Sequence, residues 1–306
     1  MLYDNILQTV GNTPLIKLNN LKNALNLKAN VYAKIEKFNP AGSIKDRVAI
    51  SIINGAEKNG LIKKGGTVIE ATSGNTGIGL AMVCKQKGYN LILTMPDTMS
   101  EERVKLLKAY GATVILTDGK LGMQGATLKA VEINKNTPNS IIADQFNTPY
   151  NYLAHYQTTG VEIFNDLNGM VDIFIATIGT GGTFTGTAKY LKENIKGVKT
   201  YGVEPANSPL ISKGYAGAHK IQGIGANFIP NVLDKSLLNG VLTCSDVDAF
   251  STAKLLAETE SILVGISSGA SLKCAINLAK LNENEGKNIV VVLPDGIDRY
   301  YSTNLL

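Results

Sequence analysis

The chain of 306 residues has few of the side chains that most often bind metals or act as nucleophiles. It contains three cysteines, Cys84, Cys244 and Cys274, with no Cys-x-x-Cys spacing, and two histidines far apart, His155 and His219. A structural zinc site needs four such ligands, and a cysteine nucleophile needs a histidine partner. The sequence therefore predicts no metal site and no Cys–His catalytic pair, and its few cysteines indicate a reducing, cytoplasmic setting.

Long apolar runs and dense charge patches are also absent from the sequence. No stretch of 18 apolar residues occurs, so we expect no membrane-spanning helix. The beginning of the chain, MLYDNILQTVGNTPLIKL, lacks a basic segment followed by an apolar one, which argues against secretion. The net charge of +5 is spread over scattered lysines with no basic stripe, so we do not expect nucleic-acid binding.

Short apolar stretches alternate with helical patterns along the chain. The strand-like stretches are GTVIEA (66–71), NLILTMP (90–96), TVILTD (113–118), VDIFIATIG (171–179), VKTYGVEP (198–205) and NIVVVLPDG (288–296). Such alternation predicts an α/β fold with parallel sheets covered by helices on both faces. The length allows two domains, and the aperiodic segment 144–156, DQFNTPYNYLAHY, is the candidate crossover between them.

A glycine-rich loop, TSGNTG (72–77), follows the first of these strand-like stretches, and we expect a helix to begin near Gly77. Backbone N–H groups at the start of a helix favour an anion, because they lack helical partners and lie at the positive end of the helix dipole. The side chains that add donors here are Thr72, Ser73, Asn75 and Thr76. The loop therefore predicts a site for a carboxylate or a phenolate-type oxygen.

A second glycine-rich loop lies in IATIGTGGTFTGTAKYL and also joins a strand to a helix. Its candidate binding residues are Gly179, Thr180, Gly181, Gly182 and Thr183. Successive backbone N–H groups of this kind form a phosphate cradle. The loop has no P-loop lysine, and Phe184 replaces the third glycine of a dinucleotide fingerprint. Either loop alone could be a tight connection, whereas both together indicate two separate anionic groups, such as a cofactor phosphate and a substrate carboxylate.

The segment FNPAGSIKDR (38–47) places Lys45 just before an apolar-periodic run. Alone, a lysine between other polar residues is typical of a solvated surface. At the start of a helix, however, the dipole disfavours its cationic form, and desolvation lowers its pKa further. An amine of that kind suits a nucleophile or a general base.

Several motifs occur in the order typical of cysteine synthases. They are NPAGSIKDR, EATSGNTGIGLA, MPDTMSEERVKLLKAYGA, IGTGGTFTGTAKYL, HKIQGIGANFIP and VGISSGAS. The chain thus resembles, over nearly its whole length, an O-acetylserine sulfhydrylase of the β-family (fold type II) of pyridoxal-phosphate enzymes. The resemblance implies two domains similar to tryptophan synthase β, each a mainly parallel twisted sheet flanked by helices. A smaller movable domain would span 47–150 and a larger one 1–46 plus 151–306, with the cofactor site in the cleft between them.

The resemblance also implies roles for individual residues. Lys45 would be the catalytic residue and form the internal aldimine with pyridoxal 5'-phosphate. The other cofactor contacts would be Asn75 at the 3′ oxygen, Gly179, Thr180, Gly181, Gly182 and Thr183 at the phosphate, Leu263 along the ring and Ser267 at the pyridine nitrogen. The substrate carboxylate would be bound by Thr72, Ser73, Asn75, Thr76 and Gln145. Asn227 stands where many cysteine synthases have glycine, in a loop expected near the site entrance.

The implied reaction is β-replacement on a β-substituted L-alanine, most simply O-acetyl-L-serine and sulfide giving L-cysteine and acetate through an α-aminoacrylate. Asn227 leaves an alternative open, in which L-cysteine is the first substrate, hydrogen sulfide leaves, and water or a thiol adds to give serine, lanthionine or cystathionine. A nicotinamide oxidoreductase is opposed by the broken glycine pattern. The resemblance further implies a homodimer and binding of the C-terminal peptide of serine acetyltransferase.

Overall fold

The computed structural model describes residues 2–301 and 303–305, and these form two compact units. The smaller unit contains the stretch that ends at Val10 and Lys45–Asn151, and the larger unit contains Gly11–Ile44 and the chain from Tyr152 onward. The division into a movable domain at 47–150 and a larger domain stays a prediction.

The larger unit is built on a six-stranded sheet with the order β1-β2-β10-β7-β8-β9. Its strands are β1 (Leu15–Lys17), β2 (Asn30–Ile35), β7 (Ile173–Thr177), β8 (Lys199–Pro205), β9 (Gly240–Cys244) and β10 (Asn288–Leu293). Only the β1–β2 pair is antiparallel within this described sheet. In the register, Val291 of β10 lies opposite Ala33 on one side and Ile175 on the other.

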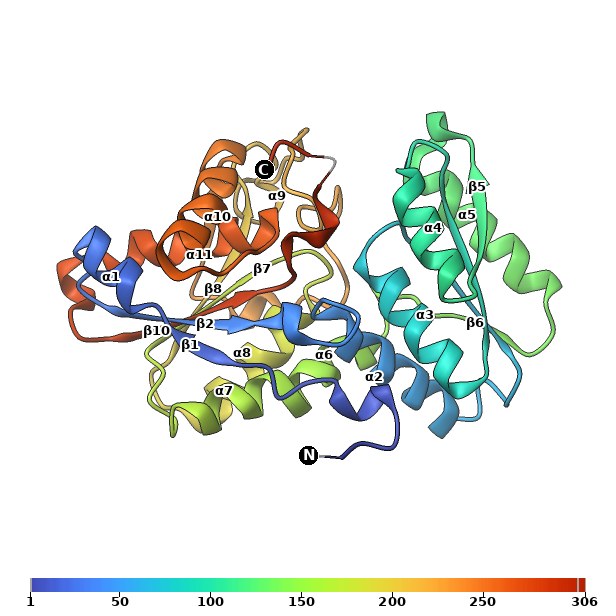
Figure 1. Ribbon diagram of the computed structural model, residues 1–306, viewed down its shortest axis with the longest axis horizontal. Helices are drawn as coiled ribbons and strands as arrows, with labels where there is room; N and C mark the ends of the chain where they lie inside the picture. The colour runs from blue at the N-terminus through green and yellow to red at the C-terminus, as the bar shows by residue number, and fades with distance from the viewer. Residues whose placement is uncertain (1, 302, 306) are drawn as a thin grey trace. The chain divides into compact units, whose positions relative to one another are not determined.

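Helices cover both faces of this sheet (Figure 1). On one face lie α1 (Asn19–Leu25), α10 (Asp246–Glu260) and α11 (Ile266–Ala279), and on the other lie α7 (Gly160–Asp166) and α8 (Gly182–Asn194). Alternate residues of β10 therefore enter two different cores: Ile289 and Val291 pack in one, Val290 and Val292 in the other. This two-sided burial explains why the strand reads as an unbroken apolar run.

The smaller unit has a four-stranded sheet, all parallel, with the order β5-β4-β3-β6. Its strands are β3 (Thr67–Ala71), β4 (Asn90–Pro96), β5 (Thr113–Thr117) and β6 (Ser140–Ile142), and its longer helices are α2 (Lys45–Lys58), α3 (Asn75–Lys87), α4 (Glu101–Ala109) and α5 (Gly122–Asn136). Helices α2 and α3 meet closely, because a Cβ at Gly79 would lie 2.9 Å from the carbonyl oxygen of Lys45. The predicted α/β class with mainly parallel sheets is confirmed.

The segment 144–156, which lacked a clean period in the sequence, becomes helical at Pro149. There α6 (Pro149–Ala154), a π-helical turn (His155–Thr159) and α7 follow one another without a break. Proline is favoured in the first turn of a helix, and a π-turn interrupts the 3.6-residue repeat, so the apolar pattern of the sequence is irregular here.

Two further features concern the described residues only. None of their helices is long and apolar enough to cross a membrane. No group of three or more histidine, cysteine or acidic side chains among them is arranged to hold a metal ion.

Candidate functional site

Lys45 is the first residue of α2 and is half-buried. The next two residues, Asp46 and Arg47, are buried. The lysine is therefore not in the fully solvated setting expected of a surface charge among charged neighbours. It stands at the N-terminal end of a 14-residue helix, where the helix dipole disfavours an additional positive charge.

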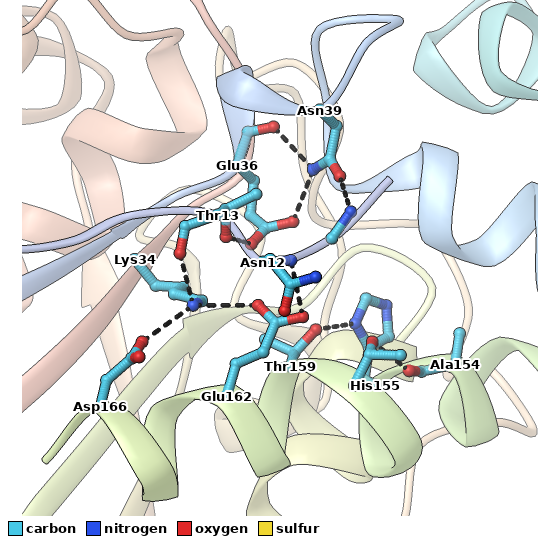
Figure 2. Close-up of polar contacts among 12 residues, drawn as sticks. Asn12, Thr13, Lys34, Glu36, Asn39, Ala154, His155, Thr159, Glu162 and Asp166 are labelled. Carbon is cyan, nitrogen blue, oxygen red and sulfur yellow. Dashed lines mark hydrogen bonds and ion pairs between the residues drawn. The ribbon is translucent and has the colours of Figure 1, made fainter. Parts of the chain in front are cut away.

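The loop before Lys45 is held by Asn39 through contacts within the larger unit (Figure 2). Its side-chain Nδ2 donates to the backbone oxygen of Glu36 and to Glu36 Oε2, both at 2.8 Å. Its Oδ1 accepts the backbone N–H of Gly11 at 2.9 Å. The loop closes at Ile44, whose N–H donates to the Pro294 oxygen at 2.9 Å, so the lysine follows directly from a fixed backbone.

A buried lysine, Lys34, lies beside this loop in the same network (Figure 2). The side chain of Lys34 is 1% exposed, and its Nζ donates to the Thr13 backbone oxygen at 2.6 Å. It forms ion pairs with Glu162 at 2.9 Å and Asp166 at 3.2 Å. The Thr13 hydroxyl donates to Glu36 Oε1 at 2.6 Å, which joins the two sets of contacts. The polar network thus connects the start of the larger unit to β2 and α7.

The first glycine-rich loop lies in the smaller unit, and its helix begins earlier than predicted. Helix α3 starts at Asn75 rather than near Gly77, because Gly74 takes an extended conformation at the N-cap. Asn75 and Thr76 therefore belong to the first helical turn. Backbone N–H groups of that turn have no partner within the helix and are suited to an anion.

The predicted carboxylate-binding residues of this unit come together around that turn. Thr76 Oγ1 lies 2.5 Å from Gln145 Oε1, although the two residues are 69 positions apart in the sequence. Both side chains are buried. Thr72 is also buried and its hydroxyl accepts the Gly74 N–H at 3.3 Å, while Ser73 is half-buried.

Glu70, the next-to-last residue of β3, was not singled out from the sequence, yet its carboxylate contacts the backbone of Asp144, the residue before Gln145. It is 3% exposed, and its Oε2 accepts the backbone N–H of Asp144 at 2.8 Å. Burial raises the pKa of Glu70 to about 7, against hydrogen bonds from the Asp144 and Gln145 backbone and from the Gln145 side chain. The signal available in the sequence was an acidic residue inside the apolar, strand-like stretch GTVIEA.

The second glycine-rich loop lies in the larger unit and leads into α8, which begins at Gly182. Gly181 has a φ of +86°, and a Cβ there would lie 2.8 Å from the Leu233 Cβ. A Cβ at Gly179 would lie 2.2 Å from the Gly223 carbonyl oxygen. Neither position has room for a side chain, so the loop presents backbone at the positive end of a 13-residue helix.

His155 supports the hydroxyl at the end of this loop, a contact that the sequence did not predict. Its Nε2 lies 3.3 Å from Thr183 Oγ1. On the other side of the ring, its Nδ1 lies 3.0 Å from Thr159 Oγ1, a contact that Figure 2 shows. His155 is buried in the π-helical turn, a feature frequent at functional sites. On the other side of the loop, the Thr180 hydroxyl accepts the Gly182 N–H at 3.5 Å.

Ser267, Leu263 and Asn227 also lie in the larger unit. Ser267 is the second residue of α11 and is 4% exposed. Leu263 is exposed. Asn227 is exposed too, in a segment that reaches the glycine loop, because the Gly225 N–H donates to the Ile178 oxygen at 3.1 Å.

These residues fit pyridoxal phosphate. The backbone cradle at α8 is suited to a phosphate monoester, with hydroxyls on both sides. The buried hydroxyl of Ser267 can serve the nitrogen of a heteroaromatic ring, and Lys45 supplies an amine.

Comparison with known proteins gives the same result. The family described as "Pyridoxal-phosphate dependent enzyme" matches residues 6–295. "Cysteine synthase B" of Campylobacter jejuni is 48% identical, over 99% of this chain and 98% of its own length. Among solved structures, "Cysteine Synthase (OASS)" of Entamoeba histolytica is 41% identical with a TM-score of 0.97, covering 100% of this chain and 91% of that one. A "hydrogen sulfide-producing enzyme" of Fusobacterium nucleatum is 50% identical with a TM-score of 0.93, covering 98% and 100%.

The chain belongs to the pyridoxal-phosphate dependent enzymes and, within them, to the family of the cysteine synthases. The predicted family, the fold class and pyridoxal 5'-phosphate as the cofactor are confirmed. The roles of the individual site residues stay predictions.

Proposed function

We propose that the protein makes L-cysteine and acetate from O-acetyl-L-serine and sulfide by β-replacement. The observation that carries this proposal is the 48% identity to a curated cysteine synthase over 99% of the chain. The site chemistry supports it, because the chain offers an amine, a phosphate cradle and a carboxylate cradle.

Pyridoxal phosphate, when bound, withdraws electrons from the Cα of an amino acid and so makes its Cα proton removable. The residues that we propose hold it are Lys45, Asn75, Gly179, Thr180, Gly181, Gly182, Thr183, Leu263 and Ser267. The residues that we propose bind the substrate are Thr72, Ser73, Asn75, Thr76, Gln145 and Asn227.

In this proposal the residues of the chain divide the work between orientation and proton transfer. The loop before α3 and Gln145 bind the substrate carboxylate and thereby fix the Cα–H bond. Lys45 Nζ takes the Cα proton as acetate leaves from Cβ, and returns it after sulfide has added to Cβ. Because acetate leaves before sulfide enters, we expect ping-pong kinetics.

A second candidate function uses L-cysteine as the first substrate and releases hydrogen sulfide. The observation that favours it is the 50% identity to a structure described as a hydrogen sulfide-producing enzyme. Lys45 and the carboxylate-binding residues would act as before, and water or a thiol would add to Cβ. Asn227 would influence the choice of nucleophile, because its exposed amide lies in the segment that contacts the glycine loop.

Further parts of the proposal rest on family membership. We infer a homodimer, a cytoplasmic location, movement of residues 47–150 as a domain when the carboxylate binds, and binding of the serine acetyltransferase C-terminal peptide. Size-exclusion chromatography with light scattering tests the dimer. Titration of the peptide against the cofactor absorbance tests the partner.

The central experiment is the visible spectrum of the purified protein with matched lysine variants. We expect a yellow band that is bleached by borohydride with covalent retention of the cofactor, and no such retention in Lys45→Ala. Lys58→Ala removes an exposed lysine at the other end of α2 and should behave as wild type. Covalent retention in Lys45→Ala would refute the assignment of the nucleophile.

Product assays then separate the two candidate functions. Cysteine formation from O-acetylserine and sulfide is compared with sulfide release from cysteine at equal substrate concentrations. Faster sulfide release would replace the first function by the second. Asn227→Gly tests the loop, and an unchanged ratio of the two rates would remove Asn227 from the site.

A further inference from the structure

His155, in the larger unit, lies between two threonine hydroxyls that belong to different helices. Its Nε2 contacts Oγ1 of Thr183, the last residue of the proposed phosphate loop, at 3.3 Å. Its Nδ1 contacts Oγ1 of Thr159, in the same π-helical turn, at 3.0 Å (Figure 2). His155 and Thr159 are both 0% exposed, so their contact is shielded from water. The imidazole therefore connects a buried hydroxyl to a hydroxyl of the loop.

Close packing of two helices fixes the imidazole in this position. A Cβ at Gly186 of α8 would lie 2.0 Å from the Tyr152 carbonyl oxygen and 2.8 Å from His155 Cβ. The missing side chain of Gly186 thus allows α8 to touch the π-helical turn. Thr183 precedes Gly186 by three residues, so both lie on the same face of α8. The approach of the two helices therefore sets His155 Nε2 beside Thr183.

Hydrogen-bond chemistry allows two arrangements of a neutral imidazole here. A neutral histidine has one N–H donor and one acceptor nitrogen, and a threonine hydroxyl has a single hydrogen. If Nδ1 carries the ring hydrogen, Nε2 accepts and Thr183 gives its hydrogen to the ring. If Nε2 carries it, Nε2 donates to Thr183, whose own hydrogen is then available to a ligand. The Thr159 hydroxyl complements either arrangement, as acceptor or as donor at Nδ1.

We propose that His155 is a positioning residue that keeps a hydrogen on Nε2, so that the Thr183 hydroxyl donates to the cofactor phosphate. The second pKa of a phosphate monoester is about 6, so at about pH 8 the group is a dianion that only accepts hydrogen bonds. A bare Nε2 would instead turn the oxygen lone pairs of Thr183 toward this negative charge. A charged imidazolium meets the same requirement, because both of its nitrogens donate. The inference deepens the proposed function and rests on it, because it takes Thr183 as a phosphate contact.

Two amide variants at position 155 separate this role from a merely structural one. The amide nitrogen of glutamine can replace Nε2, whereas that of the shorter asparagine can replace only Nδ1. His155→Gln should bind pyridoxal 5'-phosphate within about threefold of wild type, and His155→Asn about tenfold more weakly, the usual effect of losing a hydrogen bond to a charged group. Pyridoxal, which lacks the phosphate, should bind equally to both variants. The affinities are measured on the full chain, freed of cofactor, by absorbance titration.

Thr158→Ala is the matched control within the same π-helical turn. Its hydroxyl donates to the Ala154 carbonyl oxygen at 2.6 Å, so its removal leaves the two imidazole contacts in place. This variant should keep the wild-type affinity for both pyridoxal 5'-phosphate and pyridoxal.

Nitrogen NMR of the wild-type holoenzyme with isotope-labelled histidine needs no variant at position 155. The chain has two histidines, and the loss of signals in His219→Gln identifies those of the other one. We expect a hydrogen on Nε2 of His155 at about pH 8.

Three results would each overturn the inference. They are a bare Nε2 in the holoenzyme, a His155→Asn variant that binds pyridoxal 5'-phosphate at least as tightly as His155→Gln, and a loss in His155→Asn that is the same for pyridoxal. A wild-type chain that does not bind pyridoxal 5'-phosphate would instead overturn the proposed function, and this inference with it.

Discussion

Glu70 is a carboxylate in a place that opposes its charge. It is 3% exposed, the Asp144 carboxylate adds repulsion, and these effects exceed the hydrogen bonds that favour the ionised form. The pKa of Glu70 is therefore raised from 4.5 to about 7. A residue of this kind titrates near neutral pH, so its ionisation affects stability under ordinary conditions.

We predict that Glu70 makes the protein less stable as the pH rises toward 8. Because its folded pKa lies above its ordinary value of 4.5, its stabilising contribution is complete below that value and is lost as the pH rises through about 7. The full shift corresponds to about 3 kcal/mol in the free energy of unfolding. Urea denaturation of wild type and Glu70→Gln from about pH 5 to about pH 8 measures it, since the variant has no proton to lose.

Glu57→Gln serves as a control, because the pKa of Glu57 is lowered by folding whereas the pKa of Glu70 is raised. Burial acts to raise the pKa of Glu57, but hydrogen bonds from Lys87 and Tyr89 lower it overall. Its contribution is present above its ordinary pKa and is lost as the pH falls. If the free energy of unfolding changed with pH in the same way for wild type and Glu70→Gln, the expectation for Glu70 would be contradicted.

The residues that the sequence identified differ in kind from those that it missed. Lys45 and the two glycine-rich loops lie in continuous motifs, and each can be interpreted from its own neighbours. Glu70 and His155 act through partners at distant positions, Gln145 and Thr183, which become neighbours only in the fold. Contacts between residues far apart in the chain produce no local sequence pattern, so they could not be predicted from one sequence.

At the scale of elements, the turn between β7 and α8 is shaped by glycines that no other residue can replace. Gly181 combines a positive φ with close neighbours, whereas Gly197, which follows α8, has a φ of +84° and no neighbour within 4 Å of its Cβ position. Both glycines have a left-handed backbone that disfavours other residues, but only Gly181 also has neighbours that a side chain would meet. Alanine variants at the two positions therefore distinguish the effect of backbone strain from the effect of disturbing the proposed phosphate cradle.

We predict that Gly181→Ala weakens cofactor binding and that Gly197→Ala does not. Both variants should lose about 1 kcal/mol of stability from the left-handed backbone, and Gly181→Ala should lose more because its Cβ meets Leu233. Cofactor release on dilution, followed by absorbance, and thermal unfolding provide the measurements. Equal cofactor retention in the two variants would argue against a phosphate site at this loop.

The sequence predicted long, buried elements better than short ones. Strands β4, β7 and β10 were visible as apolar runs because both of their faces are covered. The three-residue strands β1 and β6 and the half-buried β9 gave no such run and were missed, and so was the six-residue β2, whose apolar residues are interrupted by Lys34. Helix α3 began two residues before its expected start, because the sequence does not show that Gly74 is extended at the N-cap.

At the scale of the whole molecule, Lys34 connects distant parts of the larger unit. Its ammonium is buried on β2 and meets Thr13 near the start of the unit and Glu162 on α7. A buried ion-pair network stabilises a protein only while all of its members are present, because removing one charged side chain leaves the charge of its partner uncompensated. We therefore expect this side chain to contribute to the stability of the larger unit.

We predict that Lys34→Met lowers the free energy of unfolding by about 3 kcal/mol, since it removes the buried ammonium that pairs with Glu162. Lys105→Met is the control, because the Lys105–Glu101 pair is exposed and should contribute less than about 0.5 kcal/mol. Urea denaturation compares the two variants. Similar losses would mean that the Lys34 network adds no more than a surface ion pair.

The position of β10 in the larger sheet also bears on how the protein is synthesised. β10 lies between β2 and β7, so it joins the first strands of this sheet to the later ones, yet it is the last strand of the described chain. The four strands of the smaller sheet all lie between residues 67 and 142. On the ribosome the smaller sheet can therefore assemble early, whereas the larger one waits until β10 has been synthesised. During that interval the edge of β2 that pairs with β10 has its backbone N–H and C=O groups unpaired, and a nascent chain in this state is a natural client for chaperones.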